Sequence, residues 1–210
     1  MSILATQEAV IVSTLIMLAL TIGLAYKMTR KYLSTKMESM LFWSLGLWAF
    51  GFGVFLEVLF GFGLYSDFLG GLYLFTVALL VNLLALGSIC LIKSKIIKNA
   101  YFGFSIFSEL LSVYAVASGN VGDILKSYVA ALNPPMIVLI ASSIITFPAA
   151  IILVATAYLS YRKKKSHRMV SIILGVIVVS IAGTLYIDAF PAFLYWSEFV
   201  GILLLWIGFI

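Results

Sequence analysis

The chain has 210 residues, of which 64% are hydrophobic and only 10% are charged, and its formal net charge is +5. A soluble domain carries about a quarter charged residues, so this composition argues against one and predicts an integral membrane protein. The single cysteine rules out a disulfide within the chain. With only one histidine besides, an ordinary four-ligand zinc site is not expected.

Seven long apolar segments follow one another along the chain. They cover residues 8–26, 40–62, 68–92, 99–117, 134–161, 169–186 and 191–210. Each is close to the roughly 20 residues that a helix needs to cross the hydrocarbon, and none alternates as membrane strands do. The sequence therefore predicts an all-α membrane protein, a single domain that is a bundle of seven transmembrane helices.

The basic residues predict how this bundle is threaded. Twelve of the 13 fall in the odd-numbered loops, namely Lys27, Arg30, Lys31, Lys36, Lys93, Lys95, Lys98, Arg162, Lys163, Lys164, Lys165 and Arg168. Loops rich in Lys and Arg stay in the cytoplasm, so we expect an outer N-terminus and a cytoplasmic C-terminus in the cell membrane. The basic patch from Arg162 to Arg168 has two possible roles. It either fixes this orientation in the membrane, or binds anionic lipid or a cytoplasmic partner.

The longest outer loop, residues 118–133, begins with the turn-forming residues Gly119, Asn120 and Gly122. Residues 123–132 follow, and they are predicted to form a short amphipathic helix on the outer surface.

Three acidic residues lie inside apolar segments: Glu57, Glu109 and Glu198. A carboxylate in the hydrocarbon costs about 2.5 kcal/mol or more, so each position needs a reason. Glu57 shares one stripe of its helix with Gly46, Gly53 and Gly61. Because glycines let helices approach closely, we expect this stripe to be a helix-packing surface and Glu57 to point into the bundle.

The other two acids also have polar or small neighbours at helical spacing. Glu109 lies on one stripe with Ser105 and Ser112, and Glu198 lies one turn from Tyr195 and Gly201. Asn82, in the third segment, is a candidate neutral partner for the acids. The helical rise places Glu109 near mid-membrane and the other two acids in the outer half.

Two functional hypotheses remain open. In the first, Glu57, Glu109, Glu198 and Asn82 line an outward-facing cavity that binds protons or a cation, for solute transport or ligand sensing. In the second, the acids are protonated or hydrogen-bonded and lock helices together, in a structural or assembly subunit of a larger membrane complex or lattice. The expected partners are membrane lipids, and further copies of the chain or other membrane subunits are possible. Nucleic acid is not expected as a partner.

We expect no enzymatic activity, no metal and no cofactor, because the apolar segments lack a histidine and no Gly-rich phosphate loop is present. Seven helices with an outer N-terminus resemble the plan of the microbial rhodopsins and of the small PQ-loop sugar transporters, in topology alone. No Lys follows Lys165 to hold retinal, and none of the four prolines is followed by Gln. Neither resemblance carries a functional residue to this chain.

Overall fold

The computed structural model describes residues 7–119, 121, 125–126, 129–130, 134–164, 170–172, 174–175, 178 and 191–209. The helices in this part are α1 (Gln7–Thr35), α2 (Glu38–Gly61), α3 (Asp67–Ile89), α4 (Lys95–Ser118), α5 (Met136–Lys164) and α7 (Pro191–Phe209). The first five are long and apolar enough to cross a membrane. A helical protein compatible with a membrane is therefore confirmed for the described residues. Of the sixth predicted segment, 169–186, only six scattered residues are described.

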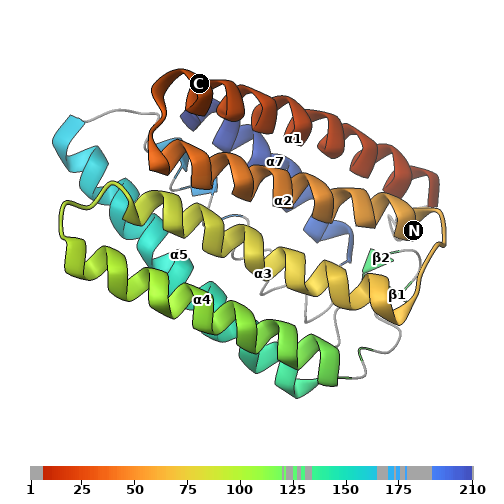
Figure 1. Cartoon of the computed structure of the whole chain (residues 1–210). Helices are drawn as coiled ribbons and strands as arrows, with labels where there is room; N and C mark the ends of the chain where they lie inside the picture. The colour runs from red at the N-terminus through yellow and green to blue at the C-terminus, as the bar shows by residue number, and fades with distance from the viewer. Residues whose placement is uncertain are drawn as a thin grey trace.

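The helices run back and forth along one axis (Figure 1). In this arrangement α1 packs against α2 and α7, α2 against α3, and α3 against both α4 and α5. One end of the bundle gathers the end of α1 and the start of α4, with exposed Lys27, Arg30, Lys31 and Lys95, and we call it the basic end. The opposite end carries β1 and β2 and is called the hairpin end.

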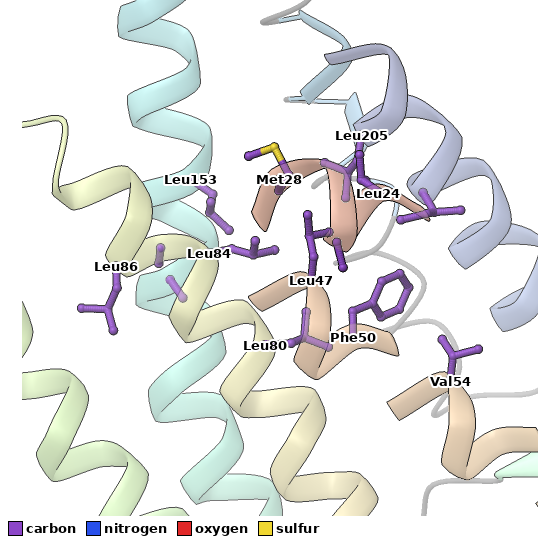
Figure 2. Packing of buried hydrophobic residues seen from close by; sticks show 14 of the residues in the cluster. Leu24, Met28, Leu47, Phe50, Val54, Leu80, Leu84, Leu86, Leu153 and Leu205 are labelled. Atoms are coloured by element: carbon purple, nitrogen blue, oxygen red, sulfur yellow. The ribbon is translucent and has the colours of Figure 1, made fainter. Parts of the chain in front are cut away.

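An apolar core joins the six helices, with Tyr101 as the buried residue from α4, and Figure 2 shows part of it. It contains Leu24 from α1, Leu47 from α2, Leu84 from α3, Leu153 from α5 and Leu205 from α7, all buried. Lipid tails are as apolar as these side chains, so in a membrane the core stabilises the bundle through close packing more than through water exclusion.

Two local predictions need correction. The first helix does not end near residue 26 but continues to Thr35, because Lys, Arg and Leu are good helix formers and loss of apolarity marks only the edge of the hydrocarbon. The predicted surface helix over 123–132 is wrong. Leu125–Lys126 (β1) instead pairs antiparallel with Val129–Ala130 (β2). An isolated helix of ten residues is marginal in water, and β2 here contacts α2 and α7.

Candidate functional site

Glu57 and Tyr73 meet between α2 and α3, toward the hairpin end. The Glu57 side chain is 1% exposed, and its Oε1 accepts a 2.6 Å hydrogen bond from Tyr73 Oη. Its other oxygen, Oε2, is buried and has no hydrogen-bond partner among the described residues. Glu57 lies about one turn before the end of α2, and Tyr73 less than two turns after the start of α3, so the two helices bring them to a similar depth.

Glu198, on α7, is a second buried acid. It is 8% exposed, and its carboxyl group lies within electrostatic range of the Glu57 carboxyl. Its Oε2 also has no hydrogen-bond partner in the described part of the chain. Both α2 and α7 contact β2 at the hairpin end (Figure 1). Glu57 and Glu198 are thus two buried acids within electrostatic range of each other, and we call them the acid pair.

Tyr73, the hydrogen-bond partner of Glu57, belongs to a cluster of aromatic and aliphatic side chains. Leu56, Phe60, Tyr73 and Val121 form one buried cluster. The Phe60 ring packs edge-on against the Tyr73 ring, with 5.7 Å between centroids, and against Tyr65 at 5.5 Å. The carboxyl groups therefore lie in a low-dielectric environment, where electrostatic interactions are stronger than in water.

Glu109 belongs to a different cluster, between α3 and α4. Asn82 donates from Nδ2 to Ser105 Oγ at 2.7 Å and to Glu109 Oε1 at 2.8 Å. Tyr101 Oη donates to Asn82 Oδ1 at 3.2 Å. Asn82 thereby uses both amide protons and its carbonyl oxygen, and this arrangement ties α4 to α3. Asn82 follows Tyr73 by roughly 14 Å along α3, so Glu109 does not join the acid pair.

The three predicted packing glycines contact different neighbours. A Cβ on Gly46 would lie 2.9 Å from Leu84 Cδ2 and 3.2 Å from the Leu80 carbonyl oxygen, both on α3. A Cβ on Gly53 would make only an ordinary 3.8 Å contact with Thr76 Cγ2. A Cβ on Gly61 would lie 3.1 Å from Ile11 on α1. Gly46 and Gly61 are therefore points where α2 approaches a neighbour closely.

The residues of the predicted cytoplasmic patch are described only in part. Arg162 is exposed near the end of α5, and Lys163 and Lys164 complete that helix. Lys165 and Arg168 lie outside the described residues. Within the described ranges, no group of three or more His, Cys, Asp or Glu side chains could hold a metal ion.

Two important residues were missed from the sequence. Tyr73 could have been found from depth, because it and Glu57 lie at similar distances from the turn that joins α2 to α3. Gly87, on α3, faces Trp43, whose Nε1 donates to the Leu84 carbonyl oxygen at 3.1 Å and to Ser88 Oγ at 3.3 Å. No feature of the sequence paired Gly87 with this tryptophan.

Comparisons of the chain with protein-family models, with curated proteins and with solved structures find no match.

Proposed function

We propose that the protein is a non-enzymatic integral membrane protein in which the acid pair takes up and releases a proton or a small cation. This exchange would serve small-solute transport or ligand sensing. The observation that carries the proposal is the burial of two carboxyl groups, those of Glu57 and Glu198, within electrostatic range of each other, each with one oxygen that has no partner among the described residues.

The physical argument concerns charge. Two ionised carboxylates side by side repel each other, and burial removes the water that would screen them. A bound proton or cation would remove this repulsion, so the occupancy of the pair and the conformation of the helices around it would be linked.

The proposal includes the topology inferred from the sequence: seven spans in the cell membrane, an N-terminus outside and the basic end in the cytoplasm. The distribution of basic residues supports this orientation. It puts the acid pair in the outer half of the membrane, closer to the external solution than to the cytoplasm.

A charge-displacement measurement tests the function. Proteoliposomes on a solid-supported membrane would be exposed to a rapid pH step, and separately to a Na⁺ or K⁺ step at constant pH. We expect a transient current with at least one of the steps, lost in both Glu57→Gln and Glu198→Gln. Ser142→Ala is the matched control, because within the described residues the Ser142 hydroxyl donates only to the Leu139 carbonyl oxygen of its own helix. A current that both Gln variants retain would refute the proposal.

A structural or assembly role is the second candidate. It is supported by the Asn82 cluster, whose hydrogen bonds hold α3 and α4 together, and by the outward face of α4. That face exposes the large apolar side chains Ile106, Phe107, Leu110 and Tyr114. Cysteine crosslinking along this face in native membranes tests the role, which predicts specific crosslinked oligomers or complexes. Crosslinking no stronger than at the exposed Ile151 on α5 would contradict it.

A further inference from the structure

We propose that the two turns at the basic end form a binding surface for anionic lipid headgroups, which is separate from the acid pair and goes beyond the function proposed above. One turn joins α1 to α2 and the other joins α3 to α4 (Figure 1). Together with their flanking residues, the turns supply three lysines and three large apolar side chains, all of them exposed. We call this set the two-turn surface: Lys36, Met37, Leu91, Lys93, Lys95 and Ile96.

Contacts between the helices hold the two turns side by side. The Phe42 ring of α2 packs edge-on against the Phe102 ring of α4, with 5.4 Å between their centroids. A Cβ on Gly87 of α3 would lie 2.9 Å from the carbonyl oxygen of Ser39, at the start of α2. Phe42 lies about one turn after the start of α2, and Phe102 about two turns after the start of α4. The exposed side chains of the two turns therefore belong to one surface.

The lengths of the helices place this surface among lipid headgroups. The helices α2, α3 and α4 have 24, 23 and 24 residues, so each is roughly 35 Å long. The hydrocarbon of a bilayer is about 30 Å thick, and the bilayer with its headgroups about 40–45 Å. Helices of this length cross the hydrocarbon and end in the headgroup layer. The turns that join them therefore lie at the depth of the lipid phosphates.

The apolar side chains identify the partner as a lipid. Ile96 is 82% exposed, and Met37 and Leu91 are 45% and 46% exposed. Each of them lies within two residues of a lysine. Apolar side chains interspersed with lysines are typical of segments in the membrane interface, where the apolar groups enter the acyl boundary and the ammonium groups reach the phosphates. A free anion or a nucleic acid would leave these apolar side chains in water.

The charge of the surface indicates that this lipid is anionic. Lys36, Lys93 and Lys95 outnumber Glu38, the one acidic residue in the segments 36–38 and 90–96. The basic end is inferred to be cytoplasmic, and anionic lipids of the cytoplasmic leaflet attract clusters of Lys and Arg beside membrane-spanning helices. Each such lysine changes the affinity by about fivefold. Three lysines are therefore enough to select an anionic lipid over a neutral one.

The lipid selectivity of the reconstituted protein tests the proposal. The full chain would be placed in phosphatidylcholine bilayers that contain spin-labelled phosphatidylglycerol or spin-labelled phosphatidylcholine. Electron paramagnetic resonance then gives the fraction of each labelled lipid that the protein immobilises. We expect a preference for phosphatidylglycerol that Lys36→Gln, Lys93→Gln and Lys95→Gln, combined in one variant, reduce at least about fivefold. Glu38→Gln should increase the preference.

A charge-matched control keeps the test specific to this surface. Arg162→Gln, Lys163→Gln and Lys164→Gln, combined at the end of α5, remove the same charge from the basic end, and this variant should retain most of the preference. An equal loss in the two triple variants would overturn the proposal, because the preference would then follow net charge. The absence of any preference in the unaltered protein would overturn it as well.

A further arm of the experiment distinguishes lipid from free phosphate. Inorganic phosphate should release no more phosphatidylglycerol than chloride at the same ionic strength, because it has no acyl chains to cover the apolar side chains. Release by phosphate beyond that chloride control would overturn the lipid as the partner.

Discussion

The hydroxyl of Tyr73 and the carboxyl group of Glu57 form a 2.6 Å hydrogen bond between α3 and α2, with both side chains buried. This bond joins two adjacent helices and orients one member of the acid pair. Its loss therefore affects both the stability of the bundle and the acid pair.

Tyr73→Phe removes this bond with little change in shape. We expect a loss of about 1 kcal/mol in the free energy of unfolding, since interhelical hydrogen bonds in membranes average about 0.6 kcal/mol and reach about 1.7 kcal/mol. Denaturant unfolding in detergent micelles measures it. A double-mutant cycle with Glu57→Leu separates the bond from other effects of either substitution. A coupling energy near zero would contradict the role given to this contact.

Asn82→Leu breaks three hydrogen bonds to α4 in one step. At roughly 0.6 kcal/mol each, their loss should destabilise the protein by about 2 kcal/mol. Hydrogen exchange of α4 should accelerate, because Ser105, Glu109 and Tyr101 lose their shared partner on α3. The control is Thr156→Ala on α5, where the hydroxyl bonds, in the part of the chain that the structure describes, only to carbonyl oxygens of its own helix. Equal exchange in the two variants would show that the cluster does not hold α4.

Gly87→Ala and Gly103→Ala form a matched pair. A Cβ on Gly87 would collide with the Trp43 ring and lie 2.9 Å from the Ser39 carbonyl oxygen, whereas no atom of the described residues lies within 4 Å of a Cβ on Gly103. Overpacking costs about 1–3 kcal/mol, so Gly87→Ala should lower the thermal midpoint. Gly103→Ala should leave it unchanged or raise it, because Ala is the better helix former. If both variants behave alike, Trp43 is not packed as described.

Cys90 is a free thiol next to the end of α3, and its labelling can be used to test both the local charge and the topology. Burial raises the pKa of the Cys90 thiol, the charge of nearby Glu38 and its hydrogen bond raise it further, and Lys98 lowers it. Since the thiolate is the reactive form, labelling by a maleimide should be slow at neutral pH and accelerate above the pKa of a free thiol. Glu38→Gln should speed labelling at a given pH, and Lys98→Gln should slow it.

The same thiol tests the threading of the chain. A membrane-impermeant maleimide should label Cys90 in inside-out vesicles and spare it in intact cells, because the basic end is inferred to be cytoplasmic. The reverse pattern would invert the proposed topology.

Helical periodicity predicts which side chains share a face of a helix, and within single helices several of these groupings agree with the structure. It placed Glu57 on the same stripe as Gly46, and Gly46 does approach α3 closely. It also grouped Ser105 with Glu109, both of which bind Asn82. Such patterns repeat every turn, so they can be read from one segment alone.

Contacts between helices could not be read in this way. Glu198 on α7 lies within electrostatic range of Glu57 on α2, and nothing in either segment specifies this relationship. The same holds for Trp43 and Gly87. Apolarity also marked where the hydrocarbon ends and not where the helix ends, which is why α1 was predicted too short.

The fit of Trp43 against Gly87 near the basic end and the Tyr73–Glu57 bond toward the hairpin end fasten α2 to α3 at two well-separated levels. Two such attachments prevent these helices from tilting or sliding independently, so they behave mechanically as one body. Glu198 belongs to α7, which packs on α1 through Trp206 and the Leu20 carbonyl oxygen. A movement of α7 relative to α2 and α3 would therefore change the distance between the Glu57 and Glu198 carboxyl groups. That distance is a direct measure of such a rearrangement of the bundle.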